Sequence, residues 1–240
     1  MRQDERPQGL TPAGVLLRNG EITVRGRMPW SSNATFLVAV ACGEDEMLAI
    51  YKPGSGERPL WDFPRGLYRR EVATAVLSGA LGWTAIPDTV VRDGPFGVGS
   101  VQRYVEHDPD DHYFTLVEDE RHHDALRRLC ALDIVANNTD RKAGHCLLDP
   151  DGAIWGIDNG LCFHPEPKLR TVIWDFAGEP VPDRVLTDLD ALLARLPAGL
   201  DGLLDDEELD AVASRTRWLL RAGCFPAPSP DHRSYPWPLV

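Results

Sequence analysis

The sequence predicts an α+β fold with two lobes, an N-terminal antiparallel sheet plus one helix and a C-terminal lobe that is mainly helical. Short runs rich in β-branched and apolar residues, separated by turn residues, occupy much of the first hundred positions. One helical pattern interrupts these runs, and from residue 119 onward the apolar spacing is mostly helical. The predicted boundaries are an N-terminal tail at 1–19, a first lobe at 20–107, a second lobe at 108–225 and a proline-rich tail at 226–240.

Each element of the first lobe follows from a local pattern. Residues 21–28, 35–42 and 46–53 are predicted strands, and the acidic GEDE segment between the last two is a hairpin turn. Glycine and proline predict a loop at the following GSGERPLWDFPRG segment. Residues 67–82 are a predicted helix, because apolar residues recur every three or four positions and Gly82 can end it. The last two predicted strands are residues 88–94 and 99–107.

The second lobe begins with a helical period from residue 119 to about 137, in which Asp133 lies near an otherwise apolar face. A Pro-Asp-Gly turn then predicts a hairpin that joins HCLLD to AIWGIDNGLCF. After a proline-rich loop, residues 183–195 and 205–222 are predicted helices. The last residues contain too many prolines for a regular helix.

Composition excludes several kinds of partner. The formal charge of -12 argues against duplex nucleic acid or an anionic membrane, since both favour a basic face. The charged N-terminal segment does not resemble a signal peptide, and no apolar run approaches the ~20 residues of a membrane helix. The five cysteines are odd in number and widely spaced, which is typical of free thiols in a reducing compartment. We therefore expect a cytoplasmic protein without nucleic-acid partners or integral membrane contact.

A dense polar motif, ANNTDRKAGHCLL, follows the helix of the second lobe. Its Asp140 can orient the proton of an incoming hydroxyl group. Eighteen residues later, Asp158 ends a strand before an Asn-Gly turn, where its carboxylate suits Mg²⁺. The alternatives are a helix end with asparagine as a left-handed cap and a plain turn. The order and spacing of the two aspartates favour the phosphoryl-transfer interpretation, which requires positioning, a cation and a lysine on the phosphates.

The first lobe offers that lysine. Lys52, one of three lysines in the chain, ends the third predicted strand, and its charge suits phosphate oxygens. Glu71 of the following helix is a candidate partner for Lys52, although both side chains are also compatible with solvated surface charges. The loop GRMPWSSNAT lacks a G-x-G-x-x-G pattern, yet its backbone N–H groups and the hydroxyls of Ser31 and Ser32 can hold phosphates. Such a loop is more often an ordinary hairpin.

Several segments together resemble one known group. NNTDRKAGH, IDNGLCF and the upstream LAIYKP, REVATAVLSGALGW and VQRYV are similar to the phosphatidylinositol 3-/4-kinase-like superfamily over about residues 20–176. The resemblance is strongest to a short actinobacterial branch of largely uncharacterised kinase-like proteins, and HipA-type Ser/Thr kinases are more distant. It implies an atypical protein-kinase-like fold that binds ATP with Mg²⁺ or Mn²⁺.

Carried over by position, the resemblance implies specific roles. Lys52 would contact the ATP phosphates with support from Glu71, and Asp140 would be the catalytic aspartate. Arg141 would be structural or close to the phosphates, and Asp158 would bind the metal ion in a turn that Asn159 and Gly160 complete. The remaining nucleotide contacts would be Gln102, Arg103, Tyr104, Val105 and Ile157, of which the first four form the strand and hinge beside adenine.

One position departs from the family pattern. His145 stands where the family usually has an asparagine whose amide oxygen binds a second metal ion. Imidazole is a poor ligand for Mg²⁺ but suits Mn²⁺. The alternatives are that His145 binds Mn²⁺, that one metal site is weak, or that Asn138 supplies an oxygen instead. Residues 164–170 lie where substrate specificity would be set, and only Lys168 and Arg170 offer anion contacts there. This is weak support for a phosphoinositide substrate.

Three functions remain open at this stage. The leading hypothesis is an ATP-dependent phosphotransferase that moves the γ-phosphate to a hydroxyl of a protein Ser/Thr, of the protein itself or of a small alcohol. The alternative is a nucleotide-binding pseudokinase that acts as a sensor or scaffold with little turnover. A metal-dependent hydrolase that uses His122, His123 and His145 is disfavoured, because adjacent histidines face different sides of a helix.

Overall fold

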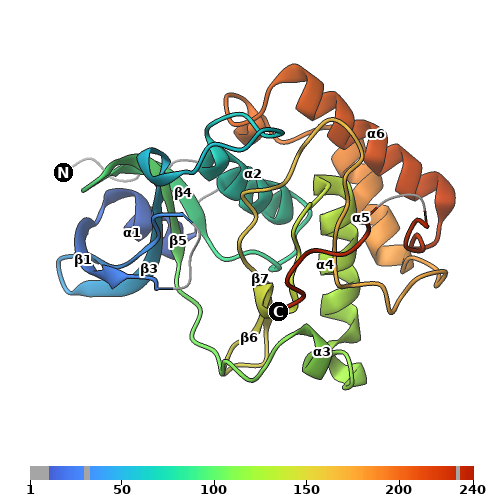
Figure 1. The fold of residues 1–240 in the computed structure, drawn as a ribbon, viewed down its shortest axis with the longest axis horizontal. Helices are drawn as coiled ribbons and strands as arrows, with labels where there is room; N and C mark the ends of the chain where they lie inside the picture. Colours follow the sequence, from blue (N-terminus) through green and yellow to red (C-terminus); the bar gives the residue numbers. More distant parts are fainter. Residues whose placement is uncertain (1–10, 30–32, 231–232) are drawn as a thin grey trace. The chain divides into compact units, whose positions relative to one another are not determined.

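The computed structural model describes residues 11–29, 33–230 and 233–240 (Figure 1). The chain divides into two compact units, each discontinuous in sequence. Unit 1 contains Met1–Tyr68 and Asp88–Tyr104, and unit 2 contains Arg69–Pro87 and Val105–Val240. The backbone therefore passes between the units three times.

Unit 1 is built on a five-stranded antiparallel sheet in the order β1-β2-β3-β5-β4. Its strands are β1 (Glu21–Arg27), β2 (Phe36–Cys42), β3 (Asp45–Pro53), β4 (Thr89–Gly94) and β5 (Gly97–Arg103). Lys52 of β3 pairs with Ser100 of β5, and Gln102 lies between Ile50 and Thr89. The edge strand β1 is charged and mostly exposed, which discourages pairing with another chain.

A helix packs on this sheet where the sequence predicts a tail. Helix α1 (Pro12–Asn19) begins after Thr11, whose Oγ1 accepts a hydrogen bond of 2.9 Å from the Gly14 N–H group. Leu17 is completely buried in the core of unit 1, which also contains Val38, Val40, Ala49, Tyr51, Val90 and Val101. This corrects the expected tail for residues 12–19. The Thr-Pro start signal was present, but eight residues give too short a period to stand out.

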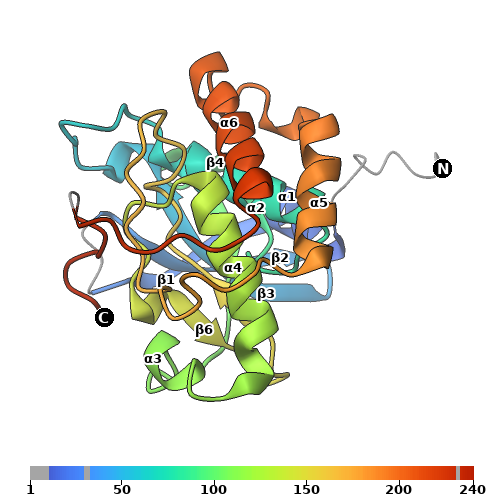
Figure 2. The same cartoon turned by 90° about the vertical axis from the view of Figure 1, so that its right-hand side faces the viewer.

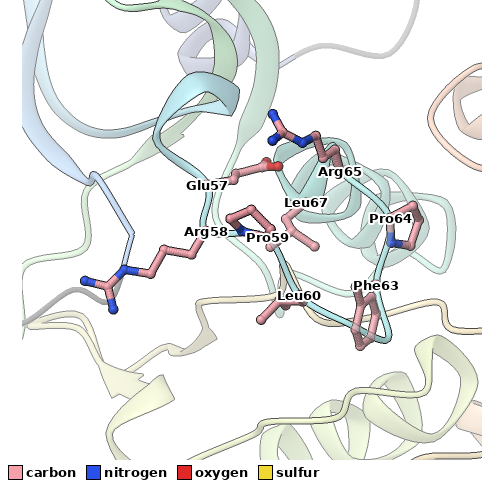
Figure 3. Close-up of a pocket in the computed structure, with 8 residues that line it drawn as sticks. All are labelled: Glu57, Arg58, Pro59, Leu60, Phe63, Pro64, Arg65 and Leu67. Atoms are coloured by element: carbon pink, nitrogen blue, oxygen red, sulfur yellow. The ribbon is translucent and has the colours of Figure 1, made fainter.

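A loop after β3 fixes the start of the next helix, α2 (Leu67–Ala80). Figure 3 shows Glu57 pointing toward this helix start, whereas Arg58 points away from it. The Glu57 carboxylate accepts hydrogen bonds of 2.8 Å from the N–H groups of Gly66 and Tyr68, and so satisfies donors that a helix start leaves unpaired. The loop lines a small pocket of about 210 Å³.

Unit 2 is mainly helical (Figure 2). Besides most of α2, it contains α3 (Tyr113–Leu116), α4 (His123–Ala136), α5 (Asp183–Ala194), α6 (Asp206–Ala222) and a two-stranded sheet of β6 (Cys146–Leu148) and β7 (Ile154–Gly156). Short 3-10 turns lie at Gly54–Gly56 in unit 1 and at Glu120–His122, Ala143–His145 and Ala198–Leu200 in unit 2. The core joins α2, α4, α5 and α6 through Leu77, Leu132, Leu189 and Leu219.

Helix α6 has well-defined ends. Asp205 accepts a hydrogen bond from the Glu208 N–H group at 2.9 Å, and the Glu208 carboxylate accepts one from the Asp205 N–H group at 3.0 Å. Gly223 ends the helix in the left-handed conformation with φ of 63°. Glu208 also forms a buried ion pair with Arg70 of α2, which connects these two helices.

The predicted α+β fold class is confirmed, and most predicted elements are present within a few residues of their expected ends. Three details differ. The strand expected at 99–107 ends at Arg103, the helix expected from 119 begins as a 3-10 turn, and α3 was not predicted. All five cysteines are free, and burial raises the pKa of Cys146 to about 12, so this thiol is unreactive. None of the helices in the described ranges has the length and apolar character needed to cross a membrane.

Candidate functional site

The polar motif begins with a left-handed residue that ends α4. Asn137 has a φ of 52°, a conformation that asparagine tolerates better than most residues. Its side-chain amide donates to the backbone oxygens of His164 and Glu166 at 2.8 and 2.7 Å and accepts from the Lys168 N–H group at 2.9 Å. The helix-cap alternative is therefore correct for Asn137. It does not explain Asp140, which lies beyond the cap.

Residues 140–142 run in an extended conformation that separates their side chains. Arg141 forms a parallel bridge with Thr171, and successive side chains of an extended chain face opposite sides. Arg141 is fully buried, whereas Asp140 and Lys142 are partly exposed. The Lys142 Nζ atom lies 3.2 Å from Asp140 Oδ2. No role was expected for Lys142, although its position two residues after Asp140 places both side chains on one side of the segment.

Arg141 holds the two loops of the site together. All five of its N–H donors have acceptors: Nε and Nη2 bond to the Asp133 carboxylate at 2.8–3.2 Å, and Nη2 also bonds to Asn159 Oδ1 at 2.7 Å. Nη1 donates to the backbone oxygens of Ile157 at 2.7 Å and His145 at 3.4 Å. A guanidinium group with no exposed surface does not contact a ligand in this arrangement. The geometry favours the structural role among the two that the resemblance implied.

Asn138 belongs to the same buried network. Its Nδ2 atom donates to Asp133 Oδ1 at 3.0 Å, and its Oδ1 atom accepts from the Asp140 N–H group at 3.0 Å. The residue is 1% exposed. Its side chain positions the backbone of Asp140. A role for Asn138 as a metal ligand stays a prediction.

The second loop presents Asp158 in an unusual conformation. Asp158 has a φ of 57°, which is uncommon for a residue other than glycine, and its side chain is 53% exposed. The next residue is fixed, because the Asn159 N–H group donates to Glu71 Oε2 at 2.9 Å. Ile157 donates its N–H group to the His145 backbone oxygen at 3.0 Å. Backbone strain of this kind persists where the surroundings hold it, and such positions cluster at functional sites.

The side chains of the two loops meet. His145 Nε2 lies 3.5 Å from Asp158 Oδ2, and the Lys142 N–H group donates to His145 Nδ1 at 3.4 Å. Burial raises the pKa of the Asp140 carboxyl above its ordinary value, and the charge of Lys142 opposes this shift. The negative charge of Asp158 raises this pKa further, and the Arg170 guanidinium lowers it. Asp140 and Asp158 therefore share one electrostatic environment.

The donor set fits a divalent cation that a phosphate group helps to bind. Within the described ranges, no group of three or more His, Cys, Asp or Glu side chains is arranged to hold a metal ion. Mg²⁺ usually takes only one or two protein carboxylates and completes its shell with phosphate oxygens and water. The exposed Asp158 carboxylate is one such ligand, and the His145 imidazole, a ligand type that suits Mn²⁺ better, lies beside it.

The site residues predicted in the first lobe do not all lie in unit 1. Lys52 is near the end of β3, as the sequence predicts. Glu71 belongs to unit 2, where its carboxylate is buried and holds the turn after Asp158. The predicted phosphate contacts Ser31 and Ser32 lie outside the described residues. That Lys52 and Asp158 act on the same ATP phosphates stays a prediction.

The proposed adenine segment spans the last passage of the backbone between the units. Gln102 is buried in the sheet and its Nε2 atom donates to Thr89 Oγ1 at 2.9 Å, so its side chain is committed within unit 1. Arg103 ends β5, and the Tyr104 N–H group donates to the Leu48 backbone oxygen at 3.0 Å. Val105 is the first residue of unit 2 in this stretch. A hinge at residues 104–105 remains compatible with this division.

The histidines of the hydrolase hypothesis do not assemble into a metal site. His123 Nε2 lies 2.8 Å from the Val117 backbone oxygen, and its ring packs edge-on against Phe176. His145 instead lies beside Asp158. The hydrolase interpretation has no support among the described residues.

The chain forms an antiparallel sheet and a helical unit, and in the helical unit two loops that Arg141 connects carry Asp140 and Asp158. These features are typical of the kinase-like class of phosphotransferases. The family model described as phosphatidylinositol 3- and 4-kinase matches residues 85–217, and the chain belongs to this family. The superfamily resemblance predicted from the motifs is confirmed.

Three individual proteins resemble this chain to different degrees. Protein Rv2133c of Mycobacterium tuberculosis is 39% identical over 262 residues, which cover 93% of this chain and 94% of that protein. The structure of hydra Fam20 with sugar aligns over 87% of this chain and 86% of its own, with a TM-score of 0.57 and 12% identity. The Helicobacter pylori proinflammatory kinase CtkA aligns over 87% and 94%, with a TM-score of 0.49 and 9% identity. The likeness to Fam20 concerns the fold alone, and the predicted atypical kinase-like fold is confirmed.

Proposed function

We propose that this protein transfers the γ-phosphate of ATP to a hydroxyl acceptor. Asp140 orients the acceptor hydroxyl and takes its proton, and Lys52 contacts the ATP phosphates. Asp158 and His145 hold Mg²⁺ or Mn²⁺, which neutralises phosphate charge. The observation that carries this proposal is the shared environment of Asp140 and Asp158, two carboxylates on loops that the buried Arg141 ties together.

Phosphoryl transfer needs few groups beyond these residues and the metal ion. Phosphoryl transfer relies mainly on positioning and on electrostatic stabilisation, so a carboxylate with a fixed backbone is more valuable than a strong nucleophile. Asn138 fixes the Asp140 backbone, and Glu71 fixes the turn that carries Asp158. The ammonium group of Lys142 favours the carboxylate form of Asp140 and so opposes the rise of its pKa on burial.

The acceptor is proposed by class. A serine or threonine hydroxyl of a protein, including this protein, or a small alcohol fits an acidic chain of net charge -12. The name of the family points to phosphoinositides, but a net charge of -12 does not favour an anionic membrane as the main partner. Protein and small-alcohol acceptors are therefore the first to test.

The deciding experiment separates binding from turnover. Thermal unfolding is measured with ATP and either Mg²⁺ or Mn²⁺, because a ligand that binds only the folded state raises Tm. Transfer from radiolabelled ATP to generic protein acceptors, to the protein itself and to small alcohols is then assayed. A rise in Tm with labelled product supports the phosphotransferase, and the absence of any rise in Tm contradicts nucleotide binding.

A nucleotide sensor with little turnover is the second candidate. The imidazole of His145 in place of a hard oxygen ligand favours it, since a weak metal site supports binding better than catalysis. A rise in Tm with ATP that is not followed by labelled product in any assay would select this function.

Removing the charge of Lys142 should shift the pH dependence of transfer. Burial raises the pKa of Asp140 and Lys142 lowers it, so Lys142→Met should raise this pKa further. Transfer needs the carboxylate, hence activity is lost as pH falls through the Asp140 pKa, and the acidic limb should move to higher pH. The measurement is kcat/KM between pH 5 and 9. Lys142→Arg keeps the charge and should restore the original limb; identical limbs in all three proteins would contradict the role of Lys142.

Replacing His145 with asparagine should change the preferred metal. An amide oxygen is a harder ligand than imidazole, so His145→Asn should raise activity with Mg²⁺ several-fold relative to activity with Mn²⁺. The backbone oxygen of His145 still accepts from Arg141 and Ile157, so the fold should be unaffected. The ratio of the two activities at saturating metal is the measurement. An unchanged ratio would show that His145 does not bind the ion.

A further inference from the structure

Unit 2 contains a pocket of about 680 Å³ that the proposed function does not use. Helix α6, the segment of residues 165–170 and residues near the C-terminus line it. Asp140, His145 and Asp158 are not among its lining residues. Its volume lies within the range of about 300–1,000 Å³ that is usual for small-molecule sites.

The pocket is cationic although the protein is strongly acidic. Its described lining residues include Lys168, Arg170, Arg215 and Arg233 and no carboxylate, whereas the whole chain carries a net charge of -12. Among the described residues, Glu166 forms an ion pair with a lining cation: its Oε2 atom lies 3.9 Å from Lys168 Nζ, on a side chain that is 76% exposed. Such a pair is weak in water and leaves the positive character of the pocket largely intact.

Arg215 supplies a buried donor without an acceptor. Its Nε atom donates to the Val135 backbone oxygen at 2.8 Å, and Nη1 donates to the His164 backbone oxygen at 3.2 Å. Its Nη2 atom is buried and has no hydrogen-bond partner among the described residues. Burial lowers the pKa of Arg215 to about 10, so the group remains charged at neutral pH. Arg215 lines the pocket as a charged group, and a positive charge held in place there favours an anion.

Two tryptophans give the pocket an apolar and aromatic wall. Trp218 lies three residues after Arg215 on α6, so both are on one side of the helix, and it remains 44% exposed. Trp174 is held in place, because its Nε1–H group donates to the Ser234 backbone oxygen at 3.2 Å. The Thr171 N–H group donates to the same oxygen at 3.1 Å. These bonds fix the wall before any ligand arrives, which lowers the entropic cost of binding.

We propose that this pocket binds a small organic anion, a compound with one negatively charged group on an aromatic or aliphatic body. The charged group contacts the arginines, and the apolar body packs against Trp218 and Trp174. Uncharged ligands would leave the positive charge of the lining residues without a counter-charge, and inorganic anions would leave the indole rings exposed. Asp140, His145 and Asp158 do not line this pocket, so binding there can be tested without assaying phosphoryl transfer.

The test uses a matched pair of fluorescent probes on the full chain. 1-Anilinonaphthalene-8-sulfonate is the anionic probe, and N-phenyl-1-naphthylamine has the same rings without the sulfonate. We expect saturable binding of the anionic probe, with the uncharged probe at least about tenfold weaker. Trp218→Ser and Arg233→Gln should each weaken binding of the anionic probe about tenfold.

The matched controls lie outside the pocket. Trp61→Ser removes a tryptophan that is 94% exposed, and Arg217→Gln removes an exposed arginine of α6 that does not line the pocket. Both controls should bind the anionic probe with the affinity of the original protein. Equal affinity of all variants, equal affinity for the two probes, or no saturable binding would each overturn the proposal. None of these outcomes depends on whether the protein transfers phosphate.

Discussion

Asp140→Asn is expected to lower phosphoryl transfer by about 10²–10⁴-fold while ATP binding is unchanged. The amide has nearly the shape of the carboxylate but cannot take the acceptor proton. The Asp140 backbone stays fixed, because its N–H group still donates to Asn138. Transfer from radiolabelled ATP measures the loss, and the ATP-induced change in Tm measures binding.

A nearby aspartate provides the control for this substitution. Asp151 lies exposed in the hairpin turn between β6 and β7, and Asp151→Asn makes the same chemical change outside the site. It should retain full transfer. If Asp140→Asn transfers phosphate at the original rate, the role assigned to Asp140 is wrong, whatever the fate of nucleotide binding.

Arg141→Met is expected to destabilise the protein by about 3–5 kcal/mol, the usual cost of breaking a buried ion pair. The substitution leaves the Asp133 carboxylate buried with only Asn138 Nδ2 as a side-chain donor. It also removes the donors to Asn159 and to the backbone oxygen of Ile157. Urea unfolding, followed by circular dichroism, measures the free energy of unfolding.

Two further variants separate charge from packing. Arg184→Met removes an exposed arginine of α5 and should change the free energy of unfolding by less than about 0.5 kcal/mol. Asp133→Leu combined with Arg141→Met replaces the pair with apolar groups, and the double variant should be more stable than Arg141→Met alone. A single variant as stable as the original protein would show that Arg141 does not hold the loops.

The sequence predicted most of the helices and strands, and it predicted the two aspartates of the candidate site. Local patterns are strong for strands bounded by turns and for helices with clear caps, which is why β1 to β5, α2, α5 and α6 were predicted. Asp140 follows a predicted helix, and Asp158 ends a predicted strand before an Asn-Gly turn. Their order and their spacing of eighteen residues predicted that they share one site. Helix α1 was missed because two turns carry little periodicity.

The supporting residues were harder to predict, although signals existed. Asp133 was already visible as a charged residue on the apolar face of a helix, and a buried charge there requires a partner. The sequence could not name Arg141 as that partner, because the contact depends on how the loop turns after Asn137. Lys142 could have been found from the alternation of an extended segment. The pocket could not be predicted from the sequence, since its lining comes from the end of α4, residues 165–174, α6 and the C-terminal segment.

The division of the chain limits how this protein can be dissected. Unit 1 is assembled from two stretches, and residues 69–87 between them contribute Ala73 and Leu77 to the core of unit 2. No single proteolytic cut can release either unit intact. A recombinant fragment of residues 1–104 would carry an orphaned apolar helix and should aggregate. A soluble version of unit 1 would require an engineered connector from Tyr68 to Asp88.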